Sequence, residues 1–156
     1  MIEIRDAAGA DAAAICTVVR RSIVELCRAD HGGDPVILGR WLANKTPGTV
    51  AAWIACRANN LLVAVEDGRI RAAGCVTEGG EVTLSYVSPD ACRRGLGTAL
   101  MRALEQRAMA LGRSGCILTS TETAHPFYER LGYADSGPRL SKFGGPGGYP
   151  MSKRLP

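Results

Sequence analysis

The stretch VSPDACRRGLGTALM (residues 87–101) runs from the end of an apolar strand, through a proline and two glycines, into a helical pattern. Glycine lets backbone amides approach a ligand closely because it carries no Cβ. Exposed amides at a helix N-terminus, helped by the helix dipole, bind phosphate groups. The turn therefore predicts a diphosphate site, and a tight turn that needs glycine only for its geometry is the alternative. Its candidate contacts are Arg93, Arg94, Gly95, Leu96, Gly97 and Thr98.

Two more specific phosphate-binding patterns do not match this turn. The chain has no Walker loop, which requires Gly-Lys followed by Ser or Thr. The dinucleotide fingerprint G-x-G-x-x-G begins at Gly95 and Gly97 but meets Leu100 in place of its third glycine. The general anion site at a helix N-terminus is the interpretation that remains.

Hydrophobic spacing divides the rest of the chain into helices and strands. Asp67-Gly68 is a strong hairpin signal between two β-rich runs, and Gly112 ends the helix that follows the turn. The run GCILTS (115–120) is interpreted as a fully apolar strand, the kind that is buried on both faces. The predicted strands are 1–7, 61–67, 69–78, 81–87, 115–120 and a C-terminal edge strand after a glycine-rich loop within 143–156; the predicted helices are 11–27, 36–45, 46–59, 96–111 and 124–132.

This order of elements predicts an α/β sandwich. We expect a mixed, mainly antiparallel central sheet of about six to seven strands flanked by helices, with a right-handed parallel crossover over residues 81–120. The chain of 156 residues shows no linker or internal repeat, so a single domain over 1–156 is expected. The edge strand is compatible with pairing between two copies, which leaves a homodimer open.

Composition excludes several classes of protein. Hydrophobic residues make up 46% of the chain and charged residues 22%, as in an ordinary folded protein. No run approaches the roughly 20 apolar residues of a membrane span, and the start lacks a signal-peptide pattern, so we expect a cytoplasmic protein without a membrane partner. The net charge of +4 is dispersed, which argues against nucleic acid as a partner and leaves room for a small anion.

The cysteines suggest neither a metal site nor a disulfide framework. They are scattered without a C-x-x-C pair, and the two histidines complete no ligand set. Most lie in apolar runs, where cysteine behaves as a small hydrophobic residue. We expect reduced core thiols at Cys16, Cys27, Cys56, Cys75, Cys92 and Cys116.

Two separate motifs extend the interpretation of the glycine-rich turn. LSYVSPDACRRGLGTALMRALE (84–105) resembles the pyrophosphate motif (Gln/Arg)-x-x-Gly-x-(Gly/Ala) of the GNAT superfamily of N-acetyltransferases. STETAHPFYERLGY (120–133) resembles the family's strand and helix that end in Phe-Tyr, three residues, then Gly-aromatic. The strong similarity covers 82–134, and the order of elements fits that family's fold over nearly the whole chain. The resemblance implies an enzyme that uses acetyl-CoA as co-substrate and needs no metal.

The resemblance also assigns roles to residues. Tyr128 matches the tyrosine that protonates the departing thiolate, a general acid; a buried aromatic with one hydroxyl partner is the alternative. The strand at 81–87 is expected to run along the pantetheine, with Tyr86 and Val87 at the thioester and an amide near Val87 as oxyanion donor. Thr123 and Phe127 are expected to belong to the cofactor site.

Two positions depart from the family pattern. Cys92 stands where Gln or Arg usually opens the pyrophosphate motif, so either Arg93 or Arg94 supplies that charge or the motif begins one register along at Arg94. Thr123 stands where many members have an asparagine that contacts the pantetheine arm. A covalent route through Cys92 is disfavoured, because that residue lies on the phosphate turn without an adjacent histidine.

The general base is left open. In ELCRADHGGD (25–34) a carboxylate and an imidazole lie together, and histidine titrates near neutrality. A solvated loop between helices is the alternative for this segment, and a water relay is the alternative for the base. The candidate bases are Glu25, Asp30, His31, Glu81 and Ser85.

We predict direct transfer of an acetyl group from acetyl-CoA to a primary amine, that of a small molecule, within a ternary complex. A peptide or protein N-acetyltransferase, which requires an open groove, is one alternative. A non-catalytic module that senses acyl-CoA is another, and Tyr128 favours the enzyme. The candidate walls of the amine pocket are Asp30, His31, Trp41, Trp53 and Tyr149, with core packing as the alternative for the two tryptophans.

Overall fold

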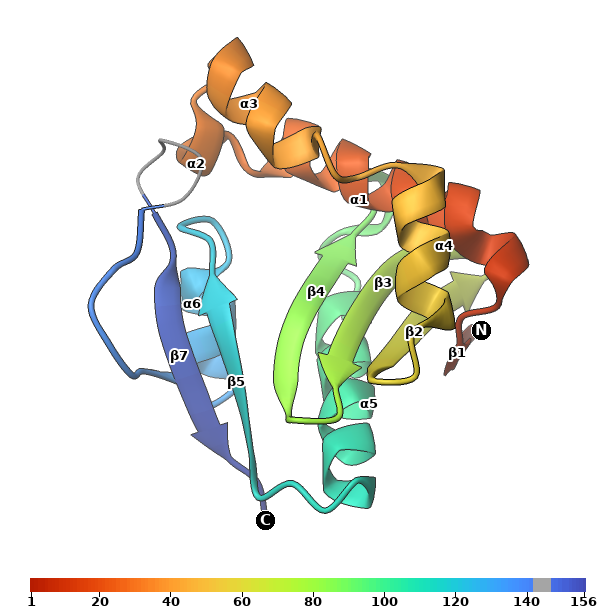
Figure 1. The fold of residues 1–156 in the computed structure, drawn as a ribbon, viewed down its shortest axis with the longest axis vertical. Coiled ribbons are helices and arrows are strands. Elements are labelled where there is room, and N and C mark those ends of the chain that lie inside the picture. The colour runs from red at the N-terminus through yellow and green to blue at the C-terminus, as the bar shows by residue number, and fades with distance from the viewer. Residues whose placement is uncertain (142–146) are drawn as a thin grey trace.

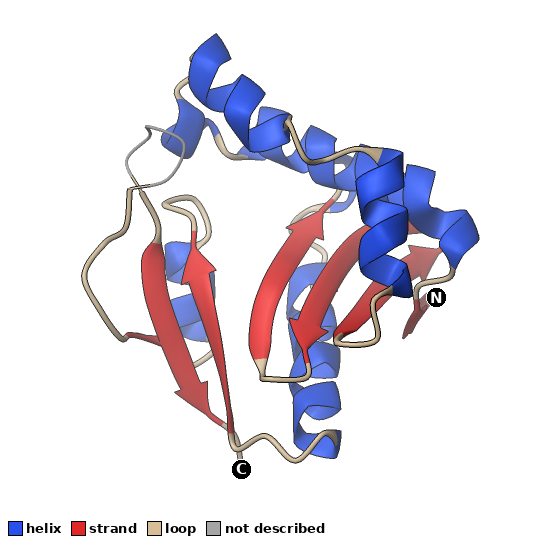
Figure 2. Cartoon of the chain, in the orientation of Figure 1, coloured by secondary structure: helices blue, strands red, loops and turns tan. Residues whose placement is uncertain are grey.

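The computed structural model describes residues 1–141 and 147–156 and contains a seven-stranded sheet with helices on both faces (Figures 1 and 2). The strand order is β1-β2-β3-β4-β5-β7-β6, and β4 and β5 form a parallel pair in an otherwise antiparallel sheet. The predicted fold class is confirmed. The strands are β1 Ile2–Asp6, β2 Asn59–Glu66, β3 Arg69–Thr77, β4 Glu81–Val87, β5 Gly115–Ser120, β6 Ala134–Asp135 and β7 Tyr149–Arg154. The helices are α1 Ala12–Leu26, α2 Arg28–His31, α3 Pro35–Leu42, α4 Pro47–Ala55, α5 Leu96–Ala110 and α6 His125–Arg130, with 3₁₀ turns η1 Gly9–Asp11 and η2 Pro89–Ala91.

Local sequence signals explain most element ends. The side chain of Asp34 accepts hydrogen bonds from two amides at the start of α3, and Thr46 accepts one at the start of α4. A proline follows each cap at the first helical position, where its missing N–H costs nothing. Asp67 and Gly68 both have positive φ, of 52° and 74°, as the predicted tight hairpin requires.

Two apolar cores cover the two faces of the sheet. Helix α5 packs on one face through side chains such as Leu100 and Leu104. Helices α1 and α4 pack on the other through Ile15, Val19 and Val50. Figure 1 shows α1 crossing the end of the sheet where β4 terminates, which brings the end of α1 beside the turn that leads into α5. Within the described residues, no helix is both long and apolar enough to cross a bilayer.

A β-bulge interrupts the pairing of β3 with β4, next to the point where β4 and β5 separate. Cys75 pairs with Leu84 and Val76 pairs with Val82, so Thr83 is an extra residue in β4. Strand β4 pairs with β5 only at Glu81 and Val82, and the strands then diverge (Figure 1). The bulge also changes which side chains point to which face: Leu84 and Tyr86 join the α1 core, whereas Val82 joins the α5 core. The result is an opening between β4 and β5 at the end where α5 begins.

Two details differ from the sequence prediction. Strand β5 is not buried on both faces, because α1 and α4 do not extend over it, and Ile117 remains 53% exposed. Strand β7 is not an edge strand, because the unpredicted two-residue β6 pairs with it at Ala134 and Asp135. Strand β6 covers β7 only at Met151 and Ser152, so a homodimer stays a prediction. Part of the predicted glycine-rich loop, residues 142–146, lies outside the described residues.

Candidate functional site

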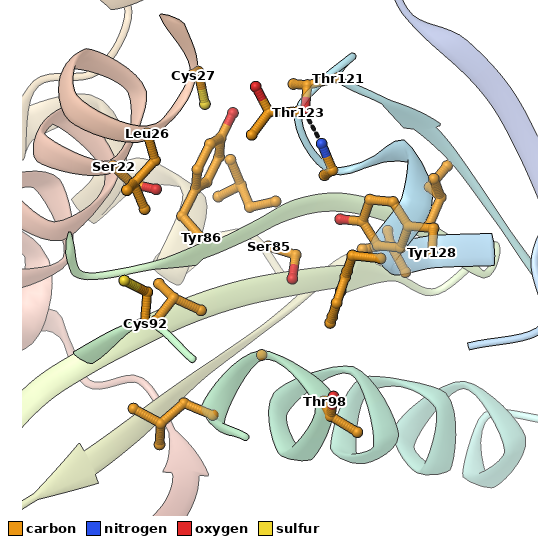
Figure 3. A pocket seen from close by; sticks show the side chains of 18 of the residues that line it. Ser22, Leu26, Cys27, Ser85, Tyr86, Cys92, Thr98, Thr121, Thr123 and Tyr128 are labelled. Carbon is orange, nitrogen blue, oxygen red and sulfur yellow. Dashed lines mark hydrogen bonds between the residues drawn. The ribbon is translucent and has the colours of Figure 1, made fainter. Parts of the chain in front are cut away.

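A cavity of about 470 Å³ lies where β4 and β5 diverge (Figure 3). Its walls come from the end of α1, strand β4, the turn before α5, the end of β5 and helix α6. It therefore connects groups that are far apart in the sequence. Ten of the predicted site residues line it: Tyr86, Val87, Arg93, Gly95, Leu96, Gly97, Thr98, Thr123, Phe127 and Tyr128.

The turn before α5 has the backbone geometry expected of an anion site. Arg93 and Gly95 have positive φ, of 63° and 80°, and Gly95 is the N-cap of α5. Among the described residues, no side chain caps this helix, so the amides of its first turn are not satisfied by a capping group. The first turn itself, from Leu96 to Thr98, lines the cavity. The partial positive charge of the helix N-terminus therefore faces this space.

Gly97 also has a packing role. A Cβ at this position would lie 3.4 Å from the ring of Phe127 and 3.5 Å from a methyl group of Val87. The absence of a side chain allows α5, α6 and the end of β4 to approach one another at the cavity wall. Any branched side chain here would have to project into the cavity or separate these elements.

The two arginines of the turn differ in position. Arg93 lines the cavity, whereas Arg94 does not. The guanidinium of Arg94 donates to Glu66 at the end of β2, with a distance of 2.7 Å from Nη2 to Oε1. Of the two neighbouring arginines that were predicted as diphosphate contacts, Arg93 therefore lies at the cavity and Arg94 is paired with Glu66 at the end of β2.

Tyr128 on α6 is buried and faces the cavity beside Ser85 (Figure 3). Burial raises the pKa of its hydroxyl to about 12, against a smaller lowering by a hydrogen bond with Ser85. The rings of Phe127 and Tyr133 pack edge-on against Tyr128 and restrict its orientation. The phenol is therefore neutral at ordinary pH, and its ring is held by aromatic neighbours.

Tyr86 and Cys27 form the opposite wall, next to α1 (Figure 3). Burial raises the pKa of Tyr86, and it also raises the pKa of the Cys27 thiol to about 12, with a smaller contribution from the nearby Asp30 carboxylate. Both groups are protonated at neutral pH. Ser22, Leu26 and Cys27 also line this wall. The segment SIVELCRADHGGDP (22–35) was predicted to form part of the amine pocket, but these three residues were not singled out, since Leu26 lies on the apolar stripe of its helix.

Four of the five candidate bases lie outside the cavity lining, and Ser85 belongs to it. Glu25 pairs with Arg21 on the surface of α1, and Glu81 lies at the opposite end of β4 from the turn. Asp30 and His31 are buried, and each is occupied by structural hydrogen bonds. The solvated loop that was the alternative for 25–34 is instead the end of α1 and the short helix α2, in which Asp30 and His31 are buried, with Gly32 as its cap.

The proposed aromatic walls of an amine pocket also lie elsewhere. Trp41 is buried in the core under α1, and Trp53 packs against the same core. Tyr149 donates a hydrogen bond to Glu122 and stacks against His125 outside the cavity lining. The core alternative for the two tryptophans is correct.

Of the cysteines, four are buried, Cys92 is half-buried and Cys56 is exposed, and all six are free thiols. The Sγ atom of Cys92 donates to the carbonyl of Pro89, 3.3 Å away, within the turn. Among the described residues, no cluster of His, Cys, Asp or Glu could hold a metal ion.

Comparison with known proteins places these features in a family. The model of the acetyltransferase (GNAT) domain matches residues 45–155. A GCN5-related N-acetyltransferase from Rhodopseudomonas palustris is 24% identical, with a TM-score of 0.87 over 98% of this chain and 95% of that one. The PaiA N-acetyltransferase from Thermoplasma acidophilum, solved with coenzyme A, is 17% identical, with a TM-score of 0.83 over 99% of both chains. The putative acetyltransferase yncA from Salmonella typhimurium, solved with acetyl-CoA, is 20% identical, with a TM-score of 0.75 over 100% of this chain and 95% of that one. No curated protein sequence matches the chain. At these identities the solved structures establish a shared fold.

Proposed function

Because this chain belongs to the GNAT acetyltransferase family, we propose that it transfers the acetyl group of acetyl-CoA directly to the amine of a small molecule. The family establishes an acetyltransferase, and the structures of similar fold include complexes with coenzyme A and acetyl-CoA. The observation that supports the assignment most is the shared cavity: an uncapped helix N-terminus and a neutral tyrosine line the same opening in the sheet.

The residues at the start of α5 fit a diphosphate. The first turn of α5 and Arg93 border the cavity, and Gly95 places no side chain there. Oriented N–H groups and a positive side chain are the donors that bind phosphate oxygens. We assign the cofactor's diphosphate to this turn and its pantetheine arm to the opening beside β4.

The backbone at the end of β4 supports an oxyanion donor. The amide of Ser88 bonds to the carbonyl of Arg71 on β3. Neighbouring residues of a strand direct their amides to opposite sides, so the amide of Val87 points towards the opening. An N–H group in this position stabilises negative charge on the thioester oxygen during attack. Val87 is therefore the assigned donor.

Tyr128 is the assigned acid. The amine nitrogen bonds to the acetyl carbon, the carbon–sulfur bond breaks, and the phenol gives its proton to the departing sulfur. Burial raises the pKa of the Cys27 thiol in the same cavity to about 12, and that of Tyr128 is also about 12. Desolvation in this cavity would also raise the pKa of the departing CoA thiol, which favours proton transfer from the tyrosine to the sulfur.

Direct transfer is favoured over an acetyl-cysteine intermediate. The raised pKa of Cys27 makes it a poor nucleophile, because the thiolate is the reactive form. Cys92 lies on the diphosphate turn, on the side of the cavity away from Tyr128 (Figure 3). The proton that the amine loses passes to water in the opening, directly or through the hydroxyl of Ser85, which donates its own proton as it accepts one. The Tyr128 phenolate, which is hydrogen-bonded to Ser85, regains its proton from the same water.

A small acceptor is favoured because a contact between α2 and the turn before α6 joins two sides of the cavity. Asp30 on α2 is hydrogen-bonded to the turn before α6. These hydrogen bonds argue against the long open groove that a peptide substrate needs. A screen of polyamines, amino acids, amino sugars and peptides that reports release of free CoA thiol tests the proposal. Turnover of peptides alone would reject a small acceptor, and tight CoA binding without turnover of any amine would favour a sensor.

The different positions of Arg93 and Arg94 predict different effects of their substitution on CoA binding. Arg93→Ala is expected to weaken CoA binding about 10- to 100-fold, because a charge-assisted hydrogen bond contributes roughly 1.5–3 kcal/mol. Arg94→Ala should change it by less than about 3-fold, because that guanidinium is bound to Glu66. Calorimetric titration with CoA measures both affinities. Equal losses in the two variants would contradict the separate positions of the two side chains.

His31 is expected to stabilise the fold and to take no part in proton transfer. Its Nδ1 accepts from the amide of Gly33 at 2.9 Å, so Nε2 carries the proton and donates to the carbonyl of Ile23 at 2.9 Å. His31→Ala should reduce the free energy of unfolding by about 1–3 kcal/mol, since it leaves buried groups without partners. Urea denaturation measures this loss, and loss of an acidic limb from the pH–rate profile would instead identify His31 as the base.

A further inference from the structure

The two halves of the sheet are joined at both ends of the opening. At the closed end, Glu81 and Val82 of β4 pair with Ile117 and Leu118 of β5. At the open end, Asp30 of α2 is buried against the turn that leads from β5 into α6, and only 9% of Asp30 is exposed. Residues 92 positions apart in the chain are thus held together across the cavity mouth.

The carboxylate of Asp30 accepts three hydrogen bonds from that turn. Its Oδ1 accepts from the amide of Glu122 at 2.6 Å. Its Oδ2 accepts from the amide of Thr123 at 3.2 Å and from the Thr123 hydroxyl at 2.6 Å. Within the described residues, all the hydrogen bonds between α2 and the turn end on this one carboxylate. Hydrogen bonds to a charged group are the stronger kind, so this contact restricts the width of the opening.

The position of Asp30 on α2 is itself fixed. The neighbouring His31 bonds to the carbonyl of Ile23 in α1 and to the amide of Gly33, and Gly32 ends α2 with a φ of 60°. Cys27, three residues before Asp30, lines the cavity, and so does Thr123. A movement of the turn relative to α2 would therefore move both walls of the cavity.

We infer that Asp30 is a positioning residue of this acetyltransferase: its clamp on residues 122 and 123 fixes the α1–α2 wall against the α6 wall and so aligns the amine with the thioester. The inference rests on the proposed function. It also gives Thr123 a different role from a cofactor ligand, because its hydroxyl donates to Asp30. The acceptor is aligned through Asp30, which itself lies outside the cavity lining.

Asp30→Asn tests the clamp, because an amide nitrogen would then face an N–H donor of the turn. We expect kcat/KM for the amine to fall about 10- to 100-fold, the range for a reactant misplaced by about 1 Å. The affinity for CoA should stay within about 3-fold of wild type, because α6 is still packed against Gly97 through Phe127. The shape of the pH–rate profile should not change, whereas loss of a general base would remove its acidic limb. Asp34→Asn is the matched control, since asparagine also caps a helix, and it should behave as wild type.

A double-mutant cycle separates positioning from cofactor contact. Thr123→Val removes the hydroxyl but keeps the side-chain shape and both backbone hydrogen bonds to Asp30, and Thr123→Ser restores the hydroxyl. Thr123→Val should lower kcat/KM in the wild-type background, Thr123→Ser should recover most of it, and Thr123→Val should have no further effect in Asp30→Ala. Additive losses, or wild-type kinetics in Asp30→Asn, would overturn the clamp. If Asp30→Ala does not fold, as judged by circular dichroism, the cycle is run in Asp30→Asn.

The inference and the proposed function fail in different ways. If the wild-type protein releases no CoA thiol with any amine, both are overturned before any variant is compared. If the wild type turns over an amine and Asp30→Asn matches it, the clamp alone is overturned.

Discussion

Replacing Tyr128 by phenylalanine is expected to lower kcat by about 100-fold, within the range that one positioned acid–base group contributes. The substitution removes one oxygen atom and keeps the ring, which packs against Phe127 and Tyr133. Affinity for CoA should change little, because the assigned diphosphate donors lie on α5. Steady-state kinetics with an amine from the screen, together with calorimetry for CoA, measure the two quantities.

The pH dependence gives a second test of the same residue. A proton donor must be protonated to act, and burial raises the pKa of Tyr128 to about 12. The neutral phenol therefore persists as pH rises from 7 through 10, and activity limited by this group would be lost only near pH 12. If kcat of the wild type fell with a midpoint near pH 10, and this fall were absent from Tyr128→Phe, the raised pKa of Tyr128 would be wrong.

Tyr149→Phe is the matched control for loss of a phenol hydroxyl. Tyr149 lies outside the cavity lining, and its hydroxyl bonds to Glu122. Its kcat should stay close to wild type. If Tyr128→Phe also retained the wild-type rate, the tyrosine would have no part in the reaction.

Gly97→Val is expected to weaken CoA binding by about 100-fold or more. A Cβ at position 97 already meets Phe127 and Val87 at 3.4–3.5 Å, so the added methyl groups must enter the cavity or push α5 away from α6. Either outcome removes the space beside the first-turn amides that are assigned to the diphosphate. Calorimetry with CoA measures the loss directly, without need of an amine substrate.

Gly48→Val provides the control for helix propensity. Gly48 is the second residue of α4, as Gly97 is the second residue of α5, and a Cβ there meets nothing within 4 Å. The two substitutions change backbone preference alike and differ only in surroundings. Equal CoA affinity in both variants would argue that the start of α5 does not hold the diphosphate.

The sequence by itself determined the elements whose signals are local. The hairpin at Asp67-Gly68 followed from residues that tolerate positive φ, and α5 followed from apolar spacing ended by a glycine. The turn before α5 was predictable because glycine, charge and helix start are contiguous in the chain. Tyr128 was found through a motif, and that motif also lies within one short segment.

Only the tertiary structure decided which groups face one another across the sheet. The bulge at Thr83, the short pairing of β4 with β5 and the exposed face of β5 arise only when the separate elements pack together. In the sequence, Asp30 and His31 were candidates for the general base in a solvated loop. In the structure both are buried, and Asp30 is hydrogen-bonded to the turn before α6. Spacing along a chain encodes a local periodicity but not the contacts of residues about 90 positions apart, because those contacts form only when the separate elements pack.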